Sequence, residues 1–262
     1  MILAVCAANE RITFGTFDDG KLTLRFEIAA STALSADETA LKISGLLNLY
    51  GRNIKEIEGI AVTSVAPRLV GLLREAVSKL SDAKFLCVGP GVKNGLNIKI
   101  DNPAELGSNN VCDAVAAIKK YSAPCIIMNF GAATVVSVID KNRIYKGGAI
   151  IPGLGISKRS LENMTEQLPV VPIEKDAYYN VLSGSTKSCM QSGIVYSAAA
   201  VTDSFAERYR EIVGENAEVI VTGHYASFIT KYCKTDVITD DNLTLEGLYL
   251  IFEKNIELPK NK

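Results

Sequence analysis

The sequence contains a single histidine, His224, and no tryptophan. One histidine excludes a histidine-rich metal site, and a Ser/His/Asp triad could be built only around that residue. No apolar run reaches the roughly 18 residues of a membrane span, so no membrane partner is expected. The formal net charge of -1 offers no excess of positive charge to neutralise a phosphate backbone. Nucleic acid is therefore not an expected partner either.

The cysteines are scattered and include no C-x-x-C pair. They are Cys6, Cys87, Cys112, Cys125, Cys189 and Cys233. Most stand among Val, Ile and Ala, and the chain shows no secretory leader. We therefore expect reduced thiols in the core of a cytoplasmic protein, with no metal site.

A chain of 262 residues with 48% apolar content can bury the core of one large or two modest domains. Its first part predicts three short strands separated by turns, over residues 2–7, 11–17 and 21–28. The same order returns 123 residues later, with strands predicted over residues 125–129, 134–140 and 143–151. The turn Asp18-Asp19-Gly20 then falls on Lys141-Asn142-Arg143. The chain is therefore predicted to contain two copies of one unit.

The remaining segments follow from periodicity and capping signals. Helices are predicted over residues 35–49, 67–80, 114–120, 157–168, 192–213 and 243–254, and strands over 59–65, 84–88 and 217–222. Residues 89–103 form a loop-rich stretch. We expect two α/β domains, 1–113 and 114–262, with a cleft between them where the first turns of both copies face each other. Small-residue turns of this kind bind phosphate through main-chain N–H groups, and carboxylates after the strands hold hydrated magnesium or activate a hydroxyl.

Several short blocks, in a fixed order, carry a resemblance to a known family. They are Gly89-Pro90-Gly91-Val92-Lys93-Asn94-Gly95, Asp101-Asn102-Pro103 with Gly107, Asn129-Phe130-Gly131-Ala132-Ala133-Thr134, Gly147-Gly148, Pro152-Gly153, Met190-Gln191-Ser192-Gly193, Thr222-Gly223 and Leu243-Thr244-Leu245-Glu246-Gly247. In these blocks the chain resembles the type III pantothenate kinases of the actin/hexokinase/Hsp70 superfamily. The resemblance implies two duplicated actin-like (ribonuclease H-like) domains and a dimer formed through the second one. It also implies ATP-dependent phosphorylation of the pantothenate hydroxyl, with magnesium and a monovalent cation.

Three motifs depart from the family pattern in their charged residues. Where the family has Asp-x-Gly-Asn-Thr, this chain has Cys6-Ala7-Ala8-Asn9-Glu10. A thiol is a poor ligand for magnesium, and Ala8 adds a Cβ where the backbone approaches phosphate. Gly-Ala-Asp-Arg becomes Gly107-Ser108-Asn109-Asn110, which removes the base for the hydroxyl and the arginine for the pantothenate carboxylate. The third motif has Asn129 in place of an aspartate.

The resemblance assigns the candidate residues to roles. Asn109 stands at the position of the catalytic base and Cys6 at that of a metal ligand. The nucleotide-binding candidates are Asn9, Asn129, Gly131, Thr134 and Gly223. The substrate-binding candidates are Gly107, Asn110 and Thr186. Thr186 matches a threonine that contacts pantothenate from the opposing protomer, and a helix cap is the alternative.

Alternatives stay open for four residues. Asn109 and Asn129 either bind a ligand through neutral hydrogen bonds or serve in turn formation and helix capping. His224, which replaces a glycine that the resemblance places near the adenine, is either a general base or a surface or cleft-wall residue with no partner. Cys6 is either a reactive thiol or a buried residue that ends a core strand.

Loss of three aspartates and one arginine, with the backbone-shaping glycines kept, predicts a catalytically degenerate family member. It would bind ATP and magnesium weakly and act as a binding, regulatory or partner subunit, in a homodimer or with a competent paralogue. The alternative is an active ATP-dependent kinase that phosphorylates pantothenate or another small hydroxyl substrate.

Overall fold

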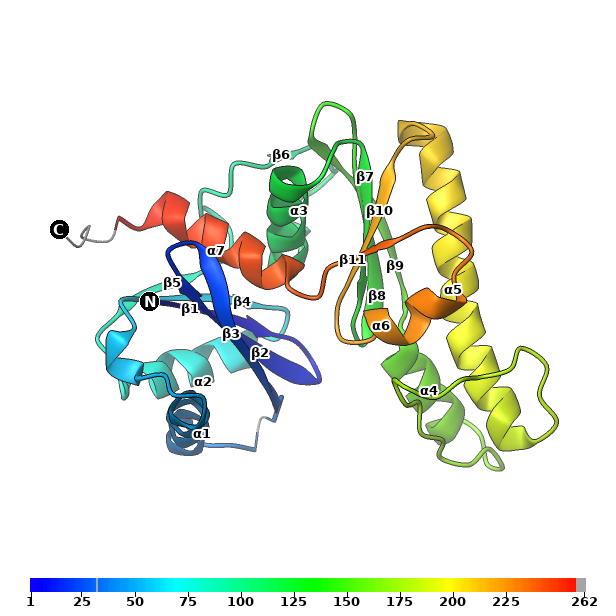
Figure 1. Ribbon diagram of the computed structural model, residues 1–262, viewed down its shortest axis with the longest axis horizontal. Coiled ribbons are helices and arrows are strands. Elements are labelled where there is room, and N and C mark those ends of the chain that lie inside the picture. Colours follow the sequence, from blue (N-terminus) through cyan, green and yellow to red (C-terminus); the bar gives the residue numbers. More distant parts are fainter. Residues whose placement is uncertain (32, 258–262) are drawn as a thin grey trace. The chain divides into compact units, whose positions relative to one another are not determined.

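The computed structural model describes residues 1–31 and 33–257 and divides into two compact units. Unit 1 consists of Met1–Gly95, Ala104–Ala116 and the segment from Leu243 onward. Unit 2 consists of Leu96–Pro103 and Ala117–Asn242. Figure 1 shows a sheet with helices in each unit.

Unit 1 contains a five-stranded sheet of order β3-β2-β1-β4-β5. Its strands are β1 (Ile2–Ala7), β2 (Arg11–Asp18), β3 (Lys21–Ala29), β4 (Gly59–Ser64) and β5 (Lys84–Cys87). The first three form an antiparallel meander, whereas β4 is parallel to β1 and β5 is parallel to β4. Crossover helices are needed for the parallel pairs, and these are α1 (Ala36–Leu49) and α2 (Pro67–Ser78).

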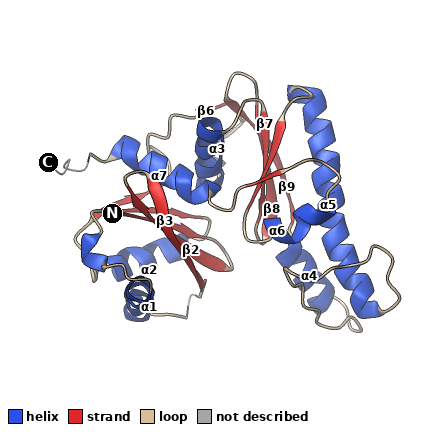
Figure 2. Ribbon diagram, in the orientation of Figure 1, coloured by secondary structure: helices blue, strands red, loops and turns tan. Residues whose placement is uncertain are grey.

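Alternation along β1 explains why both faces of this sheet are covered (Figure 2). Leu3 and Val5 pack in a cluster with Ile43 of α1 and Leu73 of α2. Ile2 and Ala4 point to the other face, where they join the cluster of α7 (Leu243–Asn255) and of the first part of α3 (Ser108–Lys120). Short helical turns over Ile54–Glu56 and Pro103–Glu105 complete the connections between elements.

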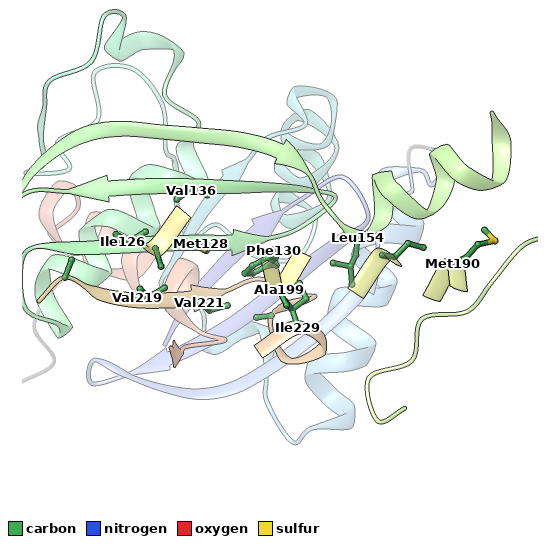
Figure 3. Close-up of a cluster of buried hydrophobic side chains, with 14 of the residues drawn as sticks. Ile126, Met128, Phe130, Val136, Leu154, Met190, Ala199, Val219, Val221 and Ile229 are labelled. Carbon is green, nitrogen blue, oxygen red and sulfur yellow. The ribbon is translucent and has the colours of Figure 1, made fainter. Parts of the chain in front are cut away.

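Unit 2 contains a six-stranded sheet of order β11-β10-β7-β8-β9-β6. Its strands are β6 (Asn97–Ile98), β7 (Cys125–Phe130), β8 (Ala133–Ile139), β9 (Ile144–Pro152), β10 (Glu218–Thr222) and β11 (Ile238–Thr239). Its helices are α4 (Leu154–Asn163), α5 (Thr186–Val213) and α6 (Ala226–Ile229), with a helical turn over Thr230–Tyr232. Figure 3 shows the core, in which Met128 and Phe130 of β7 cluster with Leu154 of α4 and Ala199 of α5.

The predicted duplication is confirmed by the two sheets. Strands β7 and β9 lie 123 residues after β1 and β3, and both units share the order of a three-strand meander followed by two parallel strands. The tight turns also correspond, because Gly20 and Arg143 both have positive φ angles, of 79° and 61°. The chain is an α/β protein built from two related sheets.

The domain boundaries differ from the sequence expectation. Residue 113 lies inside α3, whose residues up to Ala116 belong to unit 1. The final helix, α7, also belongs to unit 1, because Leu245 and Leu248 pack in one cluster with Ala4 of β1. A contact so distant in sequence leaves no signal in local periodicity.

Three predicted helices also have wrong boundaries. Helix α3 begins at Ser108, six residues before the predicted residue 114. Helix α5 begins at Thr186, six residues before the predicted Ser192, because Ser185 and Ser188 form a capping box around a polar first turn. Helix α4 covers Leu154–Asn163 rather than residues 157–168. Across residues 1–31 and 33–257, no helix is long and apolar enough to cross a membrane.

Candidate functional site

A row of polar side chains crosses the unit 1 sheet at the end of β1. Cys6 pairs with Thr13 on β2 and with Thr63 on β4, and Thr13 pairs in turn with Glu27 on β3. Paired residues of neighbouring strands point to the same face. Glu27 lies 2.6 Å from Arg25 and 3.5 Å from Arg11, so its carboxylate is held in surface ion pairs.

The beginning of α3 is tied to the end of β4 by side-chain hydrogen bonds. Thr63 Oγ1 donates to Asn109 Oδ1 at 2.8 Å and lies 2.9 Å from Ser108 Oγ. Ser108 Oγ donates to the Ser64 carbonyl at 3.1 Å. Asn109 is buried. The amide at this position is therefore a packed, hydrogen-bonded group, and an amide cannot accept a proton as a base does.

Burial raises the pKa of the Cys6 thiol to about 12, with Asp113 and Glu27 adding to the rise and Arg25 opposing it. Burial likewise holds the pKa of Cys112 well above its usual value, and Asp113 again adds to the rise. Both thiols are therefore neutral at pH 7. A neutral thiol is neither a nucleophile nor a ligand for magnesium, so Cys6 is a part-buried residue at the end of a core strand.

Asp113 is a buried carboxylate that the sequence reading missed. It is 1% exposed and accepts a hydrogen bond of 2.5 Å from Thr244 Oγ1 of α7. It stands four residues after Asn109, one helical turn along α3. A charged residue inside the otherwise apolar run Val111 to Ala117 was the available signal, but only the fold places it close enough to influence Cys6 and Cys112.

The β1–β2 turn carries Asn9 as an exposed residue. The N–H of Ala8 donates to the Arg11 carbonyl at 2.9 Å, and the Glu10 carbonyl accepts from Ala30 at 3.0 Å. The turn is therefore closed by its own backbone. At the start of α3, a Cβ added to Gly107 would lie 3.5 Å from the Asn110 amide nitrogen, so these two substrate candidates are neighbours.

Unit 2 brings three of the nucleotide candidates to the ends of its central strands. Asn129 is the last residue but one of β7, Gly131 follows the strand in the turn to β8, and Gly223 follows β10 with a φ of 96°. A Cβ at Gly223 would lie 2.6 Å from Asn129 Oδ1 and 2.7 Å from the Phe130 nitrogen, so only glycine fits there.

The fourth candidate, Thr134, lies apart from this contact. It pairs with Phe130 across β7 and β8, and its side chain lines a cavity beside α4. His224 packs its ring against Tyr225 and Phe228, at centroid distances of 4.8 and 5.9 Å, and forms part of an aromatic surface. Thr186 is the first residue of α5, and Ser185 provides the cap, so the cap reading of Thr186 is wrong.

The model of the type III pantothenate kinase family matches residues 2–208. The chain belongs to the type III pantothenate kinase family. Because the match covers most of the chain, it includes the three altered motifs together with the scaffold around them.

Solved structures with the same fold are distant in sequence. A Campylobacter jejuni protein described as a Baf family transcriptional activator has 18% identity and a TM-score of 0.57, over 97% of this chain and 98% of that one. The activator of 2-hydroxyisocaproyl-CoA dehydratase from Clostridium difficile, solved with bound ADPNP, has 14% identity and a TM-score of 0.53, over 99% of each chain. The polyphosphate/ATP-glucomannokinase of an Arthrobacter strain has 11% identity and a TM-score of 0.51, over 97% and 98%. These likenesses show an actin-like fold shared with kinases and ATPases.

Cys6, Asn109 and Asn129, which the resemblance places at a metal-ligand, a base and a nucleotide position, are not the carboxylates that a magnesium site favours. Cys6 is a neutral thiol, and Asn109 and Asn129 are amides where the resemblance expects carboxylates. Within the described part of the chain, no group of three His, Cys, Asp or Glu residues could hold a metal ion. The chain thus has the fold of the family, and Cys6, Asn109 and Asn129 are uncharged residues within it.

Proposed function

We propose that this chain is a catalytically degenerate type III pantothenate kinase homologue that acts as a binding, regulatory or partner subunit. The main observation behind this proposal is the burial and the hydrogen bond of the Asn109 side chain. Its side chain occupies the position of the catalytic base, it is buried, and its oxygen already accepts a hydrogen bond from Thr63. Loss of a general base costs roughly 100- to 10,000-fold in rate.

The residues at the candidate magnesium and ATP positions support the same proposal. Magnesium would need oxygen ligands, and the Cys6 thiol stays protonated until about pH 12. Glu10 adds a negative charge to the β1–β2 turn, which the family resemblance assigns to the ATP phosphates, and this charge repels the ATP tetraanion. We therefore expect ATP and magnesium to bind weakly. We also expect no monovalent cation to bind at Asn129, because the neutral amide replaces the carboxylate of the family motif.

The region that precedes α5 supports a role as a partner subunit. Five large apolar side chains between residues 164 and 182 are more than 70% exposed, namely Met164, Val170, Tyr178, Val181 and Leu182. A concentration of exposed apolar residues marks an interaction surface. It leads directly to Thr186, the residue that the family resemblance places in the opposing protomer's pantothenate site. The partner is a second copy of this chain or a competent paralogue, whose site Thr186 would complete.

Calorimetry with magnesium-ATP tests the degenerate site. The unaltered chain should bind at least tenfold more weakly than a family member with all three aspartates, a difference of about 1.4 kcal/mol or more. Tight binding by the unaltered chain would overturn the proposal. For the partner role, co-expression with such a family member should yield heterodimers with an altered pantothenate kinase rate, and exclusive homodimers would count against it.

A second candidate function, an active kinase for pantothenate or another small hydroxyl substrate, is favoured by Asp113. This carboxylate lies on the same helix as Asn109 and close enough to Cys6 to influence the pKa of its thiol. An ADP-release assay against small alcohols tests it, with Asp113→Asn as the decisive variant because the amide still accepts the hydrogen bond from Thr244. ADP release that is lost in Asp113→Asn would establish this candidate function. ADP release at the background rate with every alcohol would exclude it.

A further inference from the structure

Unit 2 contains a groove of about 710 Å³ between the β8–β9 hairpin and the last turns of α5. Its sheet side is formed by Val138 and residues 146–148, its hairpin turn by residues 140–142, and its helix side by Tyr209 and residues 211–214. The volume falls in the range of about 300–1,000 Å³ that is typical of ligand sites. No residue to which a family role is assigned lines this groove.

The groove lies apart from the candidate site and from the apolar region before α5. Val138 pairs with a residue near the start of β7, whereas Asn129 stands near the end of that strand. Helix α5 begins at Thr186, and an α-helix rises about 1.5 Å per residue, so Tyr209 lies roughly 35 Å along the helix from Thr186. A ligand in the groove is therefore independent of both regions.

The β9 side of the groove lies on an open edge of the sheet. Strand β6 pairs with β9 only at Ile144 and Tyr145, and the Lys99 N–H donates to the Tyr145 carbonyl at 2.9 Å. Beyond Tyr145, β9 pairs with no strand on this side among the described residues. An unpaired edge is a template for an added strand. An extended peptide can therefore add its main chain here and place alternate side chains in the groove.

The helix side of the groove provides an apolar surface. Ile212 is 74% exposed, and Tyr209 and Val213 line the groove while also packing against the core of unit 2. Val138, which is buried, faces the groove from the sheet. Burial of an aliphatic side chain against such a surface contributes about 1.5–3 kcal/mol when it is complete. The helix side therefore favours an aliphatic side chain of the ligand.

The hairpin side of the groove carries positive charge. Lys141 and Lys146 are exposed there, and no ion pair joins either ammonium group to another described residue. The neighbouring Asp140 carboxylate is already used, because its Oδ1 accepts from the N–H groups of Asn142 and Ile144 at 2.9 and 3.0 Å. The two ammonium groups are thus complementary to acidic side chains of a ligand.

The helix side, by contrast, disfavours an anion. Glu211 stands there, and the last carbonyls of α5 carry the negative end of the helix dipole. The acidic groups of a ligand must therefore lie at the hairpin, and its apolar groups at the helix. A nucleic acid carries charge along its whole length and offers the helix side no aliphatic group. A peptide can present both kinds of side chain.

We propose that this groove binds an extended acidic peptide segment of a partner protein. Its main chain lies along the β9 edge, an aliphatic side chain packs against Ile212, and acidic side chains pair with Lys141 and Lys146. The site goes beyond the proposed function, because it uses residues of unit 2 only and needs neither a nucleotide nor the apolar region before α5. Weak binding of magnesium-ATP or failure to form heterodimers therefore says nothing against it.

Fluorescence anisotropy on the full chain tests the site, with fluorescein-labelled Gly-Val-Leu-Glu-Glu as the probe and Gly-Val-Leu-Lys-Lys as its charge-reversed control. We expect saturable binding of the acidic peptide with a dissociation constant of about 0.1 mM or lower, and binding of the basic peptide at least tenfold weaker. Salt screens exposed charges, so the affinity should fall at least threefold between about 50 and 500 mM NaCl. A single-stranded DNA oligonucleotide should not displace the peptide.

Three results would each overturn the proposal. Absence of saturable binding would show that the groove is no peptide site. Equal binding of the acidic and basic peptides would show that the lysines only protect the sheet edge. Displacement by the oligonucleotide would show a general attraction of polyanions instead of peptide recognition.

A double lysine variant locates the charged part of the site. Lys141→Gln with Lys146→Gln should weaken binding of the acidic peptide at least tenfold. Lys175→Gln with Lys187→Gln is the matched control, because it removes the same charge at two exposed positions outside the groove and should leave binding unchanged. Equal effects of the two double variants would place the peptide elsewhere and refute the site.

A single variant tests the apolar part of the site. Ile212→Ser should weaken binding at least threefold, and Leu49→Ser is its control, because Leu49 is 73% exposed near the end of α1. All the substituted side chains are exposed, so none of these changes removes a core contact. Circular dichroism verifies the fold of each variant. Unchanged binding by a folded Ile212→Ser protein would refute docking against α5.

Discussion

Thr63 and Asn109 are joined by a hydrogen bond of 2.8 Å between Thr63 Oγ1 and Asn109 Oδ1. It connects β4 to the first turn of α3 across 46 residues of sequence. Because the amide oxygen is buried and accepts a hydrogen bond, this side chain contributes to stability at the position where the resemblance expects a catalytic base. The neutral amide thereby avoids a second buried carboxylate beside Asp113, one helical turn away.

Asn109→Asp should therefore destabilise the protein without restoring activity. The new carboxylate still accepts from Thr63, but burial and the nearby Asp113 would raise its pKa. A carboxyl group with a raised pKa ionises more readily in the unfolded chain, so rising pH favours unfolding. Relative to the unaltered chain, the free energy of unfolding should be lower by about 1 kcal/mol at roughly pH 8 and by less near pH 5. Urea unfolding at both pH values measures this. Asn142→Asp in an exposed turn is the control, and equal effects of the two substitutions would contradict the reading.

Restoring the whole motif set should recover nucleotide binding where single changes do not. The combined reversion is Cys6→Asp, Ala8→Gly, Glu10→Thr, Asn109→Asp, Asn110→Arg and Asn129→Asp. We expect magnesium-ATP affinity to rise at least tenfold, about 1.4 kcal/mol, in calorimetry. Residues that serve one ligand act together, so the gain should exceed the sum of the single changes. A single reversion that captures the whole gain would show that one position, and not the set, limits binding.

The protein should lose stability at alkaline pH because of its buried thiols. Burial raises the pKa of Cys125 from 9.0 to about 12, and Glu218 adds to the rise. Between those values the unfolded chain releases a proton that the folded chain keeps, so rising pH favours unfolding by up to about 1.4 kcal/mol per pH unit for each such thiol. Urea unfolding from about pH 8 to 10.5 measures the slope. Cys125→Ala should make it shallower, whereas Cys189→Ala, at an exposed thiol, should leave it unchanged.

Leu182→Glu should weaken self-association while leaving the fold intact. Leu182 is 88% exposed in the apolar region before α5, and burying a leucine at an interface contributes about 1.5–3 kcal/mol. Sedimentation should show dimer dissociation at a concentration at least tenfold higher than for the unaltered chain. Leu49→Glu is the matched control, since Leu49 is similarly exposed on α1. Equal behaviour of both variants would remove this surface from the proposed interface.

Gly223→Ala should destabilise unit 2. The φ of 96° disfavours alanine, and the added Cβ would meet Asn129 Oδ1 and the Phe130 backbone at 2.6–2.7 Å. We expect a loss of about 2 kcal/mol or more in thermal or urea unfolding. Gly71→Ala in α2, where a Cβ meets nothing within 4 Å, should instead stabilise by up to about 1 kcal/mol. A neutral result at Gly223 would mean that the backbone there relaxes easily.

Much of the architecture was predictable from local pattern alone. Strand alternation and turn residues located the three-strand meander of each unit, and the shift of 123 residues predicted their duplication. The motif blocks predicted the family, and the substituted motifs identified Cys6, Asn109 and Asn129 as altered site positions. Each of these features depends on residues that lie close together in the sequence.

Only the tertiary structure decided the rest. It assigned α7 to unit 1 through packing on β1, placed the Asp113 carboxylate near Cys6, and opened a groove between the β8–β9 hairpin and the end of α5. Each of these depends on groups far apart in sequence whose burial and electrostatic environment exist only after folding. Sequence alone therefore determined which chemical groups the chain had lost and kept, and the fold determined which of them are buried, paired or available to a ligand.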